Sequence, residues 1–194
     1  MAPTFSNPGT TVIKPESLAH IVLRTRQEQF KPMVAFYKTF LSAQDRFENE
    51  SFSFLSYDAE HHRVAIIALP GTTPSVPGSS GLLHVAFTFL SLTDLCLAYL
   101  QRKAHGIEPY WCVNHGPTTS MYYRDPDGND IEAQVENFDT LEEACGFMDG
   151  PLYGENPIGT DFAPEELIKR LESGEDERVI KKRVEIGPRM SVPI

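Results

Sequence analysis

The sequence predicts an α+β fold made of two tandem βαβββ modules that form one cupped half-barrel, followed by a C-terminal helical tail. Two strand-like segments, 18–23 (LAHIVL) and 82–87 (LLHVAF), read as copies of one another. Each is followed by an amphipathic helical pattern and then by three more strand patterns. A connector rich in proline and glycine, 70–80, separates the two halves. The pattern therefore indicates an internal duplication.

In the first half, we expect a strand at 18–25 and a helix at 30–41. The apolar residues of this helix recur at the spacing of one helical face, and Pro32 falls in the first turn, where proline is tolerated. Alternating or β-branched and aromatic segments then predict three strands, at 43–48, 52–57 and 63–69.

The second half repeats this order. We expect a strand at 82–90, a helix that begins after Ser91 and ends at Gly106, and strands at 107–113, 120–124 and 130–135. Residues 17–137 should then form one domain, with modules of about 17–70 and 81–137.

The two ends of the chain have a different character. Residues 1–16 are polar and rich in turn formers, which predicts a loose arm. Residues 138–194 form a C-terminal extension with a short charged helix near 164–173. A strap over the barrel, a dimer contact and a solvated tail are the roles that the pattern leaves open for this extension.

Composition narrows the class of protein. The chain has 194 residues, 41% of them hydrophobic, so it can bury a core. Its net charge of −10 argues against a nucleic-acid partner, because such binding needs a basic face. The three cysteines are odd in number and lack CxxC spacing, and no segment resembles a membrane span or a signal peptide. We therefore expect a cytoplasmic enzyme or small-ligand binder with free thiols.

Three polar residues stand where strands would normally carry apolar side chains. His20 and His84 occupy the same place in the two copied strands, and Glu132 lies in the last strand of the second module. Buried imidazole and carboxylate groups are costly without partners, and a metal ion could serve all three. Taken singly, each has a simpler explanation: a hydrogen-bonded core histidine, or a salt-bridged glutamate at a strand end.

The first module lacks a counterpart of the glutamate. The matching position falls near Ile66 or Ile67, neither of which can bind a metal. Two histidines and one carboxylate leave open coordination positions, the arrangement that non-haem Fe(II) oxygenases use. Three protein ligands are therefore expected rather than four.

With these features the chain resembles a known family, the vicinal oxygen chelate superfamily, and within it the type I extradiol ring-cleavage dioxygenases. The resemblance covers about 17–137 and rests on the segments around His20 and His84 and on 122–132 (YYRDPDGNDIE). It implies Fe(II), with Mn(II) as an alternative, a catechol-type diol and O2 as substrates, and ring cleavage as the reaction. It also leaves a homodimer open.

The same resemblance implies roles for three further residues. His62, in the segment 61–66 (HHRVAI), matches the acid/base histidine of these dioxygenases. Tyr122 matches a tyrosine that hydrogen-bonds the substrate oxygen, and His115 matches a histidine that contacts bound oxygen.

Two other functions stay open at this point. A metal-dependent isomerase or lyase of the glyoxalase type would use the same fold, although His62 and the apolar strand at 64–69 argue against it. A protein that binds a small ligand without chemistry would usually lack the His20, His84 and Glu132 triad.

Overall fold

The computed structural model describes residues 4–76 and 78–192. The first module contains β1 (Ile21–Thr25), a short 3-10 helix η1 (Gln27–Gln29), α1 (Phe30–Phe40), β2 (Gln44–Glu48), β3 (Phe52–Ser56) and β4 (Val64–Ala68). Its four strands form a sheet in the order β1-β4-β3-β2, in which β1 runs parallel to β4. A helix between the first strand and the rest allows that parallel pairing, because parallel strands need a crossover connection.

The second module has the same plan. It contains β5 (His84–Phe89), α2 (Leu92–Ala104), β6 (Trp111–Asn114), β7 (Thr118–Arg124) and β8 (Asp130–Glu136). These strands lie in the order β5-β8-β7-β6, and β5 runs parallel to β8 as β1 does to β4. The predicted duplication of a βαβββ module is therefore confirmed.

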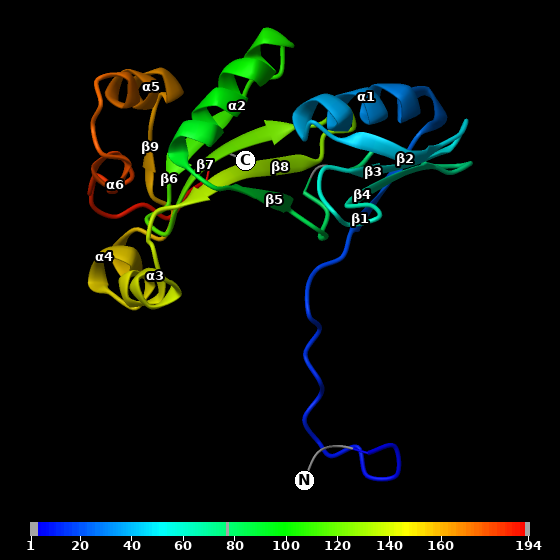
Figure 1. The fold of residues 1–194 in the computed structure, drawn as a ribbon, viewed down its shortest axis with the longest axis horizontal. Coiled ribbons are helices and arrows are strands. Elements are labelled where there is room, and N and C mark those ends of the chain that lie inside the picture. Colours follow the sequence, from blue (N-terminus) through cyan, green and yellow to red (C-terminus); the bar gives the residue numbers. More distant parts are fainter. Residues whose placement is uncertain (1–3, 77, 193–194) are drawn as a thin grey trace.

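The C-terminal extension is folded and packs on the second module (Figure 1). It contains α3 (Leu141–Met148), α4 (Pro151–Glu155), β9 (Thr160–Asp161), α5 (Pro164–Glu172) and α6 (Glu177–Ile180). Strand β9 adds a fifth strand to the second sheet by pairing with β6. The carboxylate of Glu177 accepts hydrogen bonds from the backbone N–H groups of Leu92 and Thr93, and so caps the first turn of α2.

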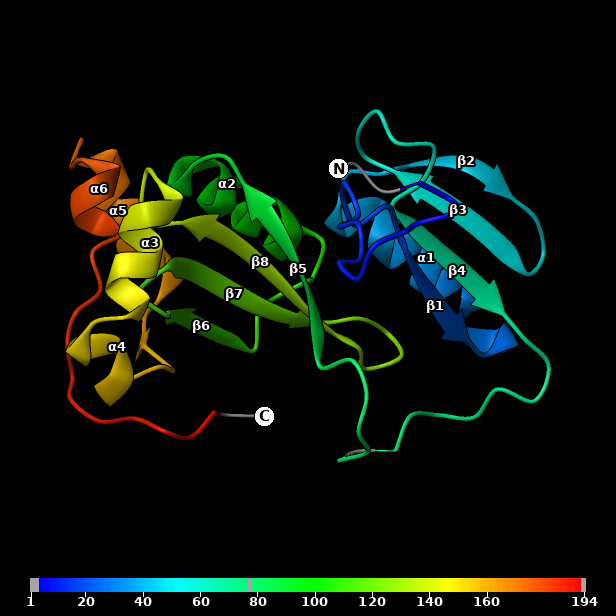
Figure 2. The same cartoon turned by 90° about the horizontal axis from the view of Figure 1, so that it is seen from below.

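The helices α1 and α2 lie on the same side of the two sheets (Figures 1 and 2). One hydrophobic core runs through both modules, and the rings of Phe40 and Tyr123 meet edge to face across the junction, 5.0 Å apart. The buried guanidinium of Arg102 donates two hydrogen bonds to the carbonyl oxygen of Phe40. The opposite face of each sheet, which we call its open face, carries neither α1 nor α2, and the two open faces lie on the same side of the molecule (Figure 2).

The predicted boundaries differ from the observed ones mainly at strand starts. Strand β1 begins at Ile21 rather than at residue 18, so His20 lies just before the strand. The guanidinium of Arg63 bonds the carbonyl oxygens of Leu18 and Ala19, which holds this segment by a side chain instead of a strand ladder. Strand β5 likewise begins at His84 itself, and β6 begins at Trp111.

The register also corrects the position that corresponds to Glu132. In the second module Ala86 pairs with Glu132, and the equivalent pair in the first module is Val22 with Ala65. The counterpart is therefore Ala65, not Ile66 or Ile67. Since alanine cannot bind a metal either, the expectation of three protein ligands is unchanged.

Two further expectations concern the cysteines and the ends of the chain. Cys96, Cys112 and Cys145 are all free, as predicted. No helix in the described part of the chain is long and apolar enough to cross a membrane. The segment before Leu18 extends away from the body of the molecule (Figure 1), while residues 1–3 of the predicted arm and residue 77 of the connector lie outside the described residues.

Candidate active site

A row of side chains crosses the open face of the second sheet. Strand register places Glu132 beside Ala86, Tyr122 opposite Glu132, and Trp111 opposite Tyr122. Because side chains alternate between the two faces of a strand, neighbours on this face come from every second residue, while Met121, Tyr123, Ile131 and Ala133 point into the core. The alternation explains how a polar site and a hydrophobic core share the same strands.

His84 and Glu132 form the centre of this row. The Nε2 atom of His84 lies 3.1 Å from Oε2 of Glu132. Burial opposes ionisation of Glu132, which is 4% exposed, but hydrogen bonds from His84 and Ser120, together with the charge of His84, outweigh it and lower the pKa of the carboxyl group. The same hydrogen bond raises the pKa of His84. A nitrogen and a carboxylate oxygen at this spacing on rigid strands form a donor pair suited to a divalent cation.

Tyr122 and His115 lie beside this pair. The ring of Tyr122 meets that of His84 edge to face at 5.4 Å, and its hydroxyl lies 3.0 Å from Nε2 of His115. Burial, with the charge of Glu132, raises the pKa of Tyr122, so the phenol stays protonated. Burial lowers the pKa of His115, which favours the neutral imidazole. The ring of Trp111 stacks on that of Tyr122, with the ring centroids 4.8 Å apart, and Trp111 is the last side chain of the row on this side.

The structure places His20 in a second group of residues, on the first module. Its ring centroid lies 4.2 Å from that of His62 and 6.5 Å from that of His61. The ring of His62 also packs on Phe54 at 5.2 Å. Burial, followed by the charges of His20 and His61, lowers the pKa of His62.

The two groups of residues do not meet within one chain. Among residues 4–76 and 78–192, no three His, Cys, Asp or Glu side chains converge closely enough to hold a metal ion. A cavity of about 90 Å³ between the modules is lined by His20, Tyr57 and the segment 85–87 of β5, so His20 faces the second module without joining His84 and Glu132. Within one chain, two of the three predicted ligands, His84 and Glu132, lie together, and His20 lies apart from them.

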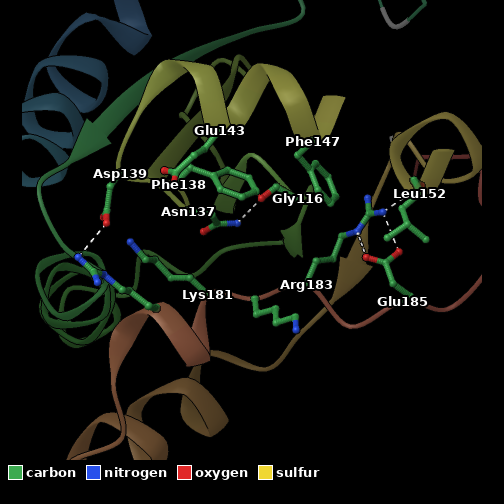
Figure 3. Close-up of a pocket in the computed structure, with 12 residues that line it drawn as sticks. Gly116, Asn137, Phe138, Asp139, Glu143, Phe147, Leu152, Lys181, Arg183 and Glu185 are labelled. Carbon is green, nitrogen blue, oxygen red and sulfur yellow. Dashed lines mark hydrogen bonds and ion pairs between the residues drawn. The ribbon is translucent and has the colours of Figure 1, made fainter. Parts of the chain in front are cut away.

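A larger cavity, of about 490 Å³, lies between the α3–α4 part of the C-terminal extension and the segment 178–185 (Figure 3). It is lined by Gly116 and Phe147 and by basic residues of the extension such as Lys181 and Arg183. None of the predicted site residues lines it. The volume of a cavity therefore does not identify the candidate active site of this protein. The donor pair of His84 and Glu132 on the open face of the second sheet does.

Sequence reasoning missed the contribution of the extension to the site. The indole N–H of Trp111 donates to Asp161 in β9, and the Nδ1 atom of His115 lies 2.6 Å from the carbonyl oxygen of Ile158. Both ring nitrogens of His115 are thus engaged, one by the extension and one by Tyr122. No local pattern around 158–161 signals these contacts, since they depend on the pairing of β9 with β6.

The fold and this site define a class of protein: the chain belongs to the Glyoxalase/Bleomycin resistance protein/Dioxygenase superfamily, whose family model matches residues 17–133. A solved domain of that description from Frankia sp. EAN1pec shares the fold, with a TM-score of 0.50 and 18% identity over 63% of this chain and 99% of the other.

Two curated relatives from Rhodococcus globerulus are more similar in sequence. Biphenyl-2,3-diol 1,2-dioxygenase 2 is 44% identical over 157 residues, which cover 80% of this chain and 82% of that protein. Biphenyl-2,3-diol 1,2-dioxygenase 3 is 44% identical over 168 residues, which cover 86% of this chain and 87% of that protein. A 1,2-cleavage of a 2,3-diol breaks the ring bond beside the pair of hydroxylated carbons, so these relatives are extradiol ring-cleaving enzymes.

Proposed function

We propose that the chain is an Fe(II)-dependent extradiol dioxygenase that opens the ring of a catechol-type diol with O2. The observation that carries this proposal is the buried Glu132 carboxylate beside His84, flanked by Tyr122, in a chain 44% identical to two extradiol enzymes. The proposal places the enzyme in the cytoplasm and takes 17–137 as its catalytic domain.

His84 and Glu132 are the first two proposed ligands, and His20 is the third. The pair fits such an ion because imidazole nitrogen and carboxylate oxygen are the donors that non-haem iron uses. Bound Fe(II), or Mn(II) in its place, would supply Lewis-acid activation of the diol and redox chemistry toward O2. His20 has the right donor chemistry but lies on the other module.

We infer that a second copy of the chain supplies His20 in a homodimer. The open face of the first sheet carries uncovered apolar side chains, with Val22 54% exposed and Phe47 49% exposed. A two-fold axis would lay this face of one copy against the His84 and Glu132 face of its partner, and the same contact repeated would complete both sites.

This arrangement predicts complementation between two inactive variants. His20→Ala and Glu132→Gln should each be inactive alone, but a co-expressed mixture should recover roughly a quarter of wild-type activity, because half of randomly paired dimers carry one intact site. Recovery is measured by ring cleavage after dimer composition has been verified by mass spectrometry. A mixture that contains heterodimers yet stays inactive would place the whole site within one chain.

His62 is the proposed acid/base residue. Its lowered pKa leaves a neutral imidazole at neutral pH, which can accept the proton of a diol hydroxyl and return it to the departing oxygen. His62→Gln should retain metal and lose turnover by about 100-fold or more. The neighbouring His61, whose side chain is 71% exposed, offers a matched control, and His61→Gln should stay within about twofold of wild type. Equal losses in both variants would remove His62 from the mechanism.

Dependence on oxygen separates this proposal from the alternatives. Protein reconstituted anaerobically with Fe(II) should leave a panel of catechols unchanged and convert them to yellow ring-opened products when air is admitted. Conversion without O2 would indicate an isomerase or lyase. Tight ligand binding with no conversion in air would indicate a binding protein.

A further inference from the structure

The C-terminal extension touches the candidate site at one side chain, His115. Its Nδ1 atom lies 2.6 Å from the carbonyl oxygen of Ile158, and its Nε2 atom lies 3.0 Å from the hydroxyl of Tyr122. A carbonyl oxygen can only accept a hydrogen bond, so the proton of a neutral imidazole must sit on Nδ1. The other nitrogen is then an acceptor, and it competes with the Glu132 carboxylate for the hydroxyl proton of Tyr122.

We propose that the C-terminal extension sets the tautomer of His115 and, through it, the direction of the Tyr122 hydroxyl proton. With that proton directed at His115, the lone pairs of the phenol oxygen remain available to the open face beside Glu132. Tyr122 therefore meets the substrate as a hydrogen-bond acceptor for a diol hydroxyl. The catalytic part of this inference rests on the proposed ring cleavage, whereas the tautomer is a property of the protein alone.

The backbone of the extension is built to approach His115 closely. Gly159 has a φ of +102°, and a Cβ atom there would lie 2.1 Å from the carbonyl oxygen of Asn114. Only glycine permits this approach, because the obstacle is backbone and cannot rotate away. Asn156, which is 1% exposed, bonds both the N–H and the carbonyl of Gly159. The carbonyl of Ile158 is thereby held in one orientation.

Arg183 also holds the turn at 156–159 in place by hydrogen bonds. Its guanidinium donates to the carbonyl oxygens of Asn156, His115 and Leu152, at 2.7, 3.1 and 3.0 Å. The Arg183 side chain is 1% exposed, and Glu185 accepts two further hydrogen bonds from it (Figure 3). The planar guanidinium of Arg183, which has five N–H donors, therefore connects the backbone of His115 to the turn at 156–159 that binds the imidazole of His115. We assign Arg183 as a positioning residue.

The first test reads the tautomer directly in the metal-free wild-type protein. Long-range proton–nitrogen NMR correlations of the histidine rings distinguish the Nδ1–H form from the Nε2–H form. His115 should show the Nδ1–H form alone. The Nε2–H form, or a mixture, would overturn the proposal without any reference to activity.

The second test loosens the turn. Arg183→Met should give a mixture of His115 tautomers and lower kcat about tenfold, as removal of a group behind a ligating or reacting side chain commonly does. Lys182→Met is the matched control, since it is the exposed neighbour in the same segment, and it should change neither readout. Arg183→Lys, which keeps a charge and fewer donors, should fall between the two and serves if the methionine variant fails to fold.

The outcomes separate this inference from the proposed function. A single Nδ1–H tautomer in a folded Arg183→Met or Arg183→Lys protein would overturn the positioning role of Arg183. The expected tautomers together with no oxygen-dependent turnover in wild type would instead refute the proposed ring cleavage and leave the role of the extension standing.

Discussion

Glu132→Gln is expected to reduce metal occupancy and ring cleavage by more than about 100-fold, because even residues behind metal ligands commonly cost 10- to 100-fold. The substitution keeps the shape of the side chain but removes the negative charge that faces His84 at 3.1 Å. A neutral amide is a weak ligand, and among the described residues no third His, Cys, Asp or Glu side chain joins the pair to compensate for the loss. Metal content is measured by elemental analysis and turnover by oxygen uptake.

Glu136→Gln provides the control for this prediction. Glu136 lies on the same strand and the same face as Glu132, four residues further along, but it is exposed. The control should keep wild-type metal content and turnover. If Glu132→Gln retained full metal, or if both variants lost it equally, Glu132 would not be a ligand.

Arg102→Ala is expected to destabilise the protein by about 3 kcal/mol, the typical cost of a large buried truncation together with an unpaired carbonyl. The side chain is 3% exposed, and its guanidinium lies 3.7 Å from the ring centroid of Phe40. It joins α2 of the second module to the end of α1 in the first. Its removal should therefore loosen the junction on which the relative position of the modules depends.

Urea unfolding monitored by circular dichroism measures this loss. Gln101→Ala, at the exposed neighbouring position of α2, should change the free energy of unfolding by less than about 0.5 kcal/mol. Arg102→Met restores most of the volume but none of the hydrogen bonds, so it should recover part of the loss. An Arg102→Ala protein within about 1 kcal/mol of wild type would show that the junction is held by other contacts.

Local sequence patterns predicted much of the fold. The apolar spacing in α1 and α2 and the copied strands around His20 and His84 are local features, and both modules form as expected. Strand β9 could not be found this way, because its two residues become a strand only by pairing with β6. Helix α3 had a readable signal, the capping box of Thr140 and Glu143.

The candidate site was predictable only where the repeat and the strand register determine it. Glu132 and His84 lie on adjacent strands of one module, so their proximity follows from the βαβββ plan. The position of His20 depends instead on how the modules pack, through contacts such as Phe40 with Tyr123. The bond from His115 to Ile158 spans 43 residues and needs the close approach at Gly159, which no periodic pattern encodes.

Isotope labelling tests the central claim most directly. Fe(II)-loaded protein is mixed briefly with a catechol under ¹⁸O₂, and the ring-opened product is analysed by mass spectrometry. The proposed dioxygenase should transfer both labelled oxygen atoms into the product, and Glu132→Gln should form no labelled product. A ring-opened product that carries no label, or the absence of any product from fully metal-loaded protein, would contradict extradiol cleavage at this site.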